Sequence, residues 1–234
     1  MKGIAGLVVL LATIVCVPAS PAEAILVDFA STDATVEFNI GTNSMTITLT
    51  NTGTVSAIED TLTGVVFTFS ATPPGETLTG ASAAGTASCT GAGASTSCST
   101  DTTPVSESGS SPFGWTLAVS GSTDSLQAGA GSFKPKGIVN SSIVASGKDG
   151  LGNSQHLPYL LGPVTFTKTF STPASESLTV TAVTFDFGTK PDTQTGLETI
   201  PLTPVPEPST MFLGGTGLIL FVYVARKRIF RRRA

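Results

Sequence analysis

Residues 34–53 read ATVEFNIGTNSMTITLTNTG, and this stretch decides the fold class. Apolar and polar side chains alternate through residues 35–40 and again through 45–50, and Gly41-Thr42-Asn43 interrupts the pattern. A period of two places one set of side chains on each face of a strand, with apolar residues facing a core and hydroxyl groups facing outward. The stretch therefore predicts two strands joined by a tight turn, with a second turn at Asn51-Thr52-Gly53.

The same alternation recurs on both sides of this stretch. It predicts further strands at residues 25–30, 61–70, 113–119, 138–145, 164–170 and 177–188. Seven or eight strands without a convincing helix favour an all-β domain over residues 25–190, built as an antiparallel β-sandwich. A β-solenoid is the alternative, but no repeat of fixed period is present.

Two irregularities accompany these predicted strands. Lys168 falls on the apolar face of its strand, which predicts an edge strand or a side chain that snorkels to solvent. The apolar residues of 177–188 change parity between Val180 and Val183. A bulge or a bend would explain that change.

Two segments lack large apolar side chains and predict long Gly/Ser/Thr loops, the first of them a surface excursion with weak strands at most. Residues 71–111 contain only Leu78 and Val105 as large apolar residues, and residues 120–137 are polar and rich in glycine. The first segment cannot bury enough apolar surface to support a core of its own. Cys89 and Cys98 lie within it, and a local disulfide between them is the expected state in an oxidising compartment.

The N-terminus has the organisation of a secretory signal peptide over residues 1–24. Lys2 precedes an apolar run at residues 4–17, and Ala22-Glu23-Ala24 places small residues at −3 and −1 of a cut after Ala24. A cut after Ala22 is the alternative. The sequence thus predicts a signal helix, export across a membrane and signal peptidase as a partner.

The C-terminal residues 205–234 form a three-part segment behind a polar linker at 191–204. It opens with Val205-Pro206-Glu207-Pro208, continues with a glycine-containing apolar span at 210–225, and closes with a basic tail at 226–234. The span would be about 24 Å long as a helix, which is marginal for a bilayer core of about 30 Å. By the positive-inside rule, the basic tail stays in the cytoplasm. The positively charged residues of this tail are Arg226, Lys227, Arg228, Arg231, Arg232 and Arg233.

This three-part segment resembles the PEP-CTERM sorting domain of Gram-negative bacteria, a tail that is also classed as the C-terminal domain of ice-binding proteins. The resemblance covers about 30 of 234 residues. It implies that an exosortase, a membrane cysteine protease, cuts near Pro206-Glu207-Pro208 after transient anchoring in the inner membrane. It further implies a mature protein at the cell surface or outside the cell, associated with exopolysaccharide and biofilm.

The charge of the body excludes one class of function. Residues 25–204 contain five lysines, no arginine and 14 acidic residues, a formal net charge of −9. Nucleic-acid binding needs clustered Lys and Arg, so we exclude it.

Catalytic and metal-binding motifs are equally scarce. His156 is the only histidine and is expected in a loop or at a strand start, and Glu59-Asp60 is expected in a solvated turn. Asp149 and Asp186 could ligate calcium, but the spacing of a calcium loop is missing. We therefore expect no enzyme, no cofactor and no metal.

Threonine rows remain as candidates for a binding surface. Thr46, Thr48 and Thr50 share one strand face, as do Thr165, Thr167 and Thr169. High β-propensity alone can place threonine on exposed strands. The alternative is a flat hydroxyl array that binds glycan or ice or carries O-linked sugar. Two functions stay open: a matrix component that interacts with exopolysaccharide, and a carbohydrate- or ice-binding module.

Overall fold

The structure is a computed structural model that describes residues 24–91, 95–129, 136–143, 150–152 and 156–188. These residues form an all-β body with two short 3₁₀ helices, η1 (Ile58–Asp60) and η3 (Pro112–Gly114). The strands are β1 (Ile25–Ala30), β2 (Ala34–Ile40), β3 (Ser44–Asn51), β4 (Leu62–Phe69), β5 (Glu76–Thr90), β6 (Ser97–Asp101), β7 (Val105–Ser108), β8 (Trp115–Ser120), β9 (Thr123–Ala128), β10 (Ile138–Val139), β11 (Tyr159–Phe170) and β12 (Val180–Phe187).

The alternating stretch forms the centre of a meander, as predicted. β2 pairs with β1 on one side and β3 on the other, both antiparallel, and the turn at 41–43 joins β2 to β3. Val36, Phe38 and Ile40 are buried while Glu37 and Asn39 are exposed. The period of two therefore translates directly into a buried and an exposed face.

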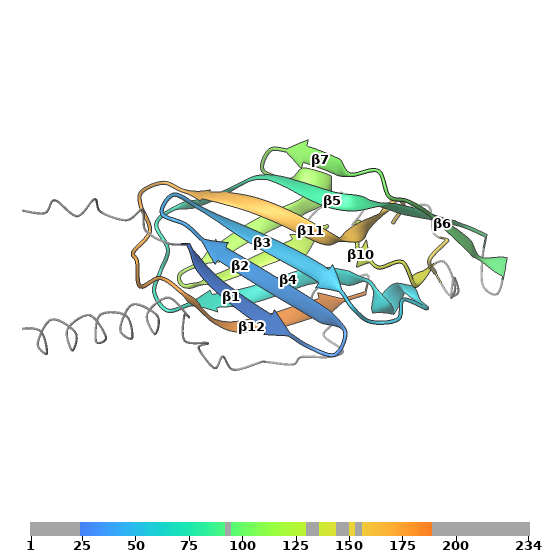
Figure 1. Cartoon of the computed structure of the whole chain (residues 1–234), viewed down its shortest axis with the longest axis horizontal. Helices are drawn as coiled ribbons and strands as arrows, with labels where there is room; N and C mark the ends of the chain where they lie inside the picture. Colours follow the sequence, from blue (N-terminus) through green and yellow to red (C-terminus); the bar gives the residue numbers. More distant parts are fainter. Residues whose placement is uncertain (1–23, 92–94, 130–135, 144–149, 153–155, 189–234) are drawn as a thin grey trace, which may run out of the picture. The chain divides into compact units, whose positions relative to one another are not determined.

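The strands pair in two antiparallel groups that β10 connects. The first group is ordered β1-β2-β3-β11-β5, with β6 and β7 paired to the far side of β5. In the second group, β4 lies between β12 and β9, and β9 pairs with β8. β10 pairs parallel with β11 and antiparallel with β4. Figure 1 shows β1, β2, β3, β11 and β5 side by side.

Aromatic contacts join strands of the two groups. The ring of Phe38 on β2 lies 5.0 Å from that of Phe67 on β4, and Trp115 on β8 lies 4.9 Å from Phe166 on β11. None of these strand pairs shares a backbone ladder, so the contacts are made between apolar faces. The core of the body therefore lies between the two groups, where these large rings bury most of their surface.

The predicted loop at 71–111 is wrong, because its largest part is β5. This 15-residue strand pairs with β11 over most of its length. Ala81, Ala83, Ala87 and Cys89 are buried at alternating positions. The period of two is present but is carried by small residues, and β11 supplies the large side chains that β5 lacks. The segment is a core strand, with β6 and β7 beside it.

The predicted connection at 120–137 is also wrong in its first part. β9 pairs with β8 in a hairpin and with β4 on its other edge. Asp124, Leu126 and Ala128 are buried and form its inward face. A single large apolar residue in that set was too weak a signal for a strand. β8 itself begins at Trp115, because Phe113 adopts a positive φ of 54° in η3.

The remaining strand predictions are confirmed with shorter or longer bounds. β10 covers only Ile138–Val139 of the segment predicted at 138–145, and β11 starts earlier than predicted, at Tyr159. The change of parity in the last strand coincides with a register shift between Val180 and Ala182. The predicted bulge or bend in β12 therefore corresponds to a shift in its register with β4.

The prediction for Lys168 is wrong. β11 lies between β3 and β5, so it is not an edge strand, and the Lys168 side chain has no solvent exposure. Its ammonium group meets two carboxylates instead of reaching solvent.

Candidate functional site

The outer face of the first strand group carries a continuous line of polar side chains. The pairing registers place Asp28 on β1 opposite Glu37, Glu37 opposite Thr48, Thr48 opposite Thr165, and Thr165 opposite Ser82. These five residues, which we call the polar row, run across five adjacent strands. Neighbouring strands are about 4.8 Å apart, so the row presents a polar group at each such step.

The two predicted threonine rows lie next to each other in this face. Because β3 and β11 are antiparallel neighbours, Thr48 faces Thr165 and Thr46 faces Thr167. The hydroxyl groups of Thr48 and Thr165 are 3.0 Å apart and form a hydrogen bond. All four side chains are half-buried. Threonine pairs across strands stabilise sheets, so the pairing is structural even without a ligand.

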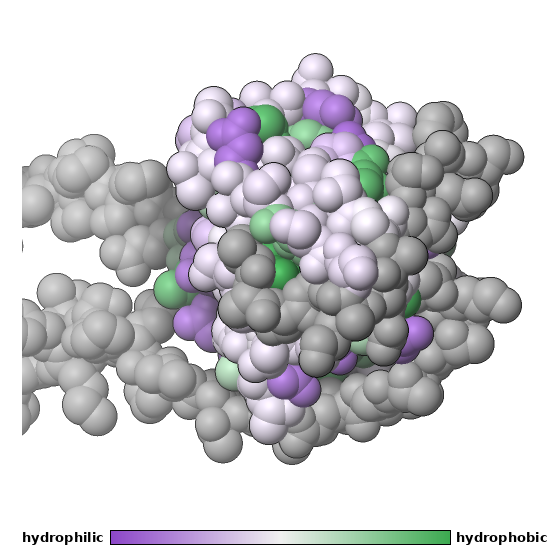
Figure 2. Space-filling view, turned by 90° about the vertical axis from the view of Figure 1, so that its right-hand side faces the viewer, coloured by the Kyte–Doolittle hydropathy of each residue, from purple (hydrophilic) through white to green (hydrophobic). Residues whose placement is uncertain are grey.

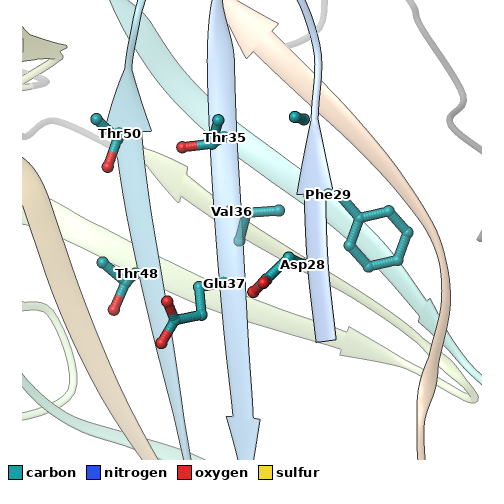
Figure 3. Close-up of a pocket in the computed structure, with 8 residues that line it drawn as sticks. Asp28, Phe29, Thr35, Val36, Glu37, Thr48 and Thr50 are labelled. Carbon is teal, nitrogen blue, oxygen red and sulfur yellow. The ribbon is translucent and has the colours of Figure 1, made fainter. Parts of the chain in front are cut away.

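A shallow hollow lies at the β1 end of the polar row. Asp28, Thr35, Glu37, Thr48 and Thr50 line it, together with Phe29, Ala30 and Val36. Figure 3 shows Asp28, Glu37 and Thr48 in line across three strands, while the Phe29 side chain points away from them. Two carboxylates beside several hydroxyl groups give a surface that accepts and donates hydrogen bonds to a polyhydroxy ligand.

The carboxylates at this end were missed in the sequence. Asp28 and Glu37 each occupy the exposed position of an alternating strand, where a charged residue needs no explanation. Only the β1–β2 register places them opposite each other, and such a like-charged pair is mildly destabilising. Period-two alternation identifies their face but not their partner.

The other acidic candidates have structural environments. Asp60 accepts hydrogen bonds from the backbone nitrogens of Ser56 and Ala57 at 2.8 and 2.9 Å. Partial burial acts to raise its pKa, but these hydrogen bonds and that of the Ser56 hydroxyl lower it overall. Asp60 therefore holds the turn before β4, and Glu59 precedes it in η1.

The residues considered for a metal or for catalysis are not brought together. Asp186 is buried and accepts a hydrogen bond from Gln127 Nε2 at 3.1 Å, while Asp149 lies outside the described residues. His156 lies three residues before β11. Within the parts of the chain that the structure describes, no group of three or more His, Cys, Asp or Glu side chains is placed to hold a metal ion.

The predicted disulfide is present. Cys89 on β5 and Cys98 on β6 occupy directly opposed positions of the antiparallel pair, with Cα atoms 4.0 Å apart. Both half-cystines are buried in a cluster with Val55, Tyr159 and Leu161. The bond therefore fastens a short outer strand to the core strand β5.

The surface at the β6 end of the body is neither strongly charged nor strongly apolar. In Figure 2 most coloured residues are pale, and only scattered patches are strongly hydrophilic or hydrophobic. Such a surface follows from the Gly, Ala, Ser and Thr composition of β5 and β6. Single exposed apolar residues of this kind indicate no docking site.

Several predicted functional residues lie outside the described residues. These are Ala22 of the signal cleavage site, the linker at 191–204, the motif Val205-Pro206-Glu207-Pro208, the apolar span and the basic tail. Ala24 is described and directly precedes β1. Among the described residues, no helix is long and apolar enough to cross a membrane.

Comparison with known families identifies the C-terminal segment. Residues 204–228 match the PEP-CTERM protein-sorting motif. The chain therefore carries a protein-sorting signal, which implies an exosortase as processing partner and an exported, membrane-anchored precursor that is sorted to the cell surface. Neither the comparison with curated proteins nor that with solved structures gives a match.

Proposed function

We propose that this chain is a non-enzymatic surface or matrix protein that exosortase processing delivers to the outside of the cell. The match of residues 204–228 to the sorting motif carries this proposal. A signal peptide over residues 1–24 starts export, and the span at 210–225 holds the precursor in the inner membrane. Processing near Val205–Pro208 then frees the body from its temporary anchor.

The body serves as a rigid β scaffold in this proposal. Its two strand groups, with apolar faces in contact through Phe38–Phe67 and Trp115–Phe166, support an antiparallel β-sandwich. In a sandwich, the outer face of β1-β2-β3-β11-β5 does not pack against the core, so it is available to bind a ligand.

The ligand class we propose for this outer face is exopolysaccharide. Sugar hydroxyl groups donate hydrogen bonds to the carboxylates of Asp28 and Glu37 and exchange them with the hydroxyl groups of Thr48 and Thr165. The acidic character of the body disfavours a strongly acidic polymer. A neutral polysaccharide therefore suits the polar row best.

A pair of isosteric substitutions tests this assignment. T48V/T165V removes two hydroxyl groups from the polar row and keeps the β-branched shape. The matched control is T68V/T123V, which removes a cross-strand threonine pair between β4 and β9, with hydroxyl groups 3.4 Å apart. We expect T48V/T165V to weaken binding of the secreted protein to a glycan array and to its host's exopolysaccharide at least threefold. Equal binding by both double variants and the wild type would refute the polar row as the contact.

A defined ice-binding module is the second candidate. The in-register pairs Thr48–Thr165 and Thr46–Thr167 place threonine hydroxyl groups side by side on two neighbouring strands, which is the observation that favours it. Inhibition of ice recrystallisation by the wild type, lost in T48V/T165V but kept in T68V/T123V, would support ice binding over polysaccharide. Absence of inhibition together with glycan binding would leave the matrix role.

A further inference from the structure

Lys168, Asp124 and Glu76 form a buried cluster that the sorting function does not use. Lys168 Nζ lies 2.6 Å from Asp124 Oδ2 and also contacts Glu76 Oε1. The three side chains have no solvent exposure. They come from three strands, β11, β9 and β5, that are far apart in the sequence.

Aromatic rings close this cluster off from water. The rings of Phe67, Phe69 and Phe170 surround Lys168 Nζ, with centroids 5.0, 4.5 and 5.8 Å away. Burying one ammonium group with two carboxyl groups in such a site is costly unless every polar atom finds a partner. Here Glu76 Oε2 and Asp124 Oδ1 are buried without a hydrogen-bond donor. As an ion-paired cluster, the arrangement is therefore poorly satisfied.

We propose that Lys168 and Asp124 condense to a side-chain amide bond inside the folded body, with Glu76 as the proton carrier. The Lys168 amine attacks Asp124 Cγ, the new bond forms between Nζ and Cγ, and one Asp124 oxygen leaves as water. An ammonium and a carboxylate give one amide and one water, so atoms and charge balance without an oxidant, a reductant or another reactant. Two of the buried charges disappear.

The distances place the reacting atoms within reach. A carboxyl C–O bond is about 1.2 Å, so the 2.6 Å contact puts Nζ within about 3.8 Å of Cγ. Reacting groups held near 3–3.5 Å behave as if present at effective concentrations of about 10⁵ M or more. The fold thus supplies the proximity that makes amide formation feasible without a separate enzyme, and it excludes the water that would favour hydrolysis.

Glu76 is the third participant because it touches the nucleophile and interacts with the second carboxyl group. Burial raises the pKa of Glu76 to about 7 against the lowering effect of the Lys168 ammonium group, and the interaction with Asp124 adds to the rise. A carboxyl group with this pKa exchanges protons near neutral pH. It carries two protons, one after the other, from the nitrogen to the departing oxygen and returns to its starting state.

The bond would join the two strand groups covalently. Lys168 belongs to the group of β1-β2-β3-β11-β5, and Asp124 to the group of β12-β4-β9-β8. The Cys89–Cys98 disulfide links two adjacent strands of one group and so leaves this cross-connection open. An amide bond, unlike a disulfide, also survives reducing conditions.

Mass spectrometry of the purified, folded full chain tests the proposal. After reduction of cysteines, we expect an intact mass lower than the sequence mass by one water molecule, beyond any terminal processing. Trypsin does not cut after an acylated lysine, so cleavage after Lys168 should be lost. Fragment spectra should show a branched peptide that joins Lys168 to Asp124.

Two variants and a control complete the test. E76Q should keep its full sequence mass, because the glutamine side chain cannot carry the proton and no water is released. D124A should also keep its full sequence mass, because the carboxyl group that Lys168 attacks is gone. E176Q, with its change at an exposed position before β12, should release one water molecule as the wild type does. A wild-type chain with its full sequence mass would overturn the proposal even if E76Q fails to fold. So would a dehydration that maps to a succinimide at Asp149-Gly150 without a branched peptide.

Discussion

At the scale of single residues, Asn51 connects three segments of the body. Its Nδ2 donates to the carbonyl oxygens of Asp60 at 2.8 Å and Ile138 at 3.1 Å, and its Oδ1 accepts from the Gly53 nitrogen. The side chain is only 2% exposed. N51A leaves these buried groups without partners, so we expect a loss of about 3 kcal/mol in the free energy of unfolding.

Urea unfolding of N51A beside N39A measures this loss. Asn39 lies on the exposed face of β2, and removal of its side chain should change stability by less than about 0.5 kcal/mol. Similar midpoints for the two variants would show that the Asn51 hydrogen bonds contribute little.

Tyr159 makes the stability of the body depend on pH in the alkaline range. Its hydroxyl group donates to the Leu151 carbonyl oxygen at 3.1 Å, and burial raises its pKa from 10.0 to about 12. The unfolded chain therefore loses this proton first. The stabilisation is complete below pH 10.0 and declines as the pH rises toward 12.

The Y159F variant isolates this contribution. It should be about 1 kcal/mol less stable at pH 8, since it lacks the hydrogen bond. Its free energy of unfolding should then fall less steeply than that of the wild type between pH 9 and 11. Parallel curves over that range would contradict the assignment to Tyr159.

At the scale of elements, β5 depends on close approach of its neighbours. A Cβ atom added at Gly85 would lie 2.0 Å from the Asp101 carbonyl oxygen and 2.9 Å from Thr102 Cα. G85A therefore has to push the β6 backbone away from β5, and we expect a loss of about 2–3 kcal/mol in unfolding free energy. At Gly41 the nearest atom is 3.4 Å away, so G41A is the matched control. Equal thermal midpoints for G85A and G41A would argue against tight β5–β6 packing.

The strands that the sequence predicts are those whose alternation uses large side chains. Phe38, Ile47 and Phe166 show the period of two at first sight, because each places a bulky apolar group in the core. β5 has the same period, but Ala and Gly carry it, and they are equally common in loops. β9 escaped prediction because Asp124 occupies a core position. Whether a small or charged residue is buried depends on which strand pairs beside it, and the local sequence does not reveal that partner.

At the scale of the whole molecule, the candidate sites depend on pairings between distant segments. The threonine rows were predicted separately, yet only the β3–β11 register makes them one surface. Lys168 was recognised as an anomaly on an apolar face, but Asp124 and Glu76 could not be assigned to it from sequence. The side-chain hydrogen bonds Thr48–Thr165, Lys168–Glu76 and Lys168–Asp124 join residues at least 44 positions apart in the chain. Patterns along the chain identify faces, whereas long-range pairing assembles sites.

The sorting motif makes a prediction about the whole molecule in its host. If an exosortase processes the chain near Val205–Pro208, the mature protein lacks Arg231–Arg233, and its intact mass ends close to Pro206–Pro208. The variant P206A/E207A/P208A should instead stay in the membrane fraction at the mass of the uncut precursor. T193A/T195A, which changes the preceding linker, should be processed normally. Because the motif lies outside the body, both variants should keep the same unfolding midpoint, which separates a sorting defect from misfolding. A mature protein that still carries Arg231–Arg233, or one cut normally in a host without its exosortase, would refute this processing.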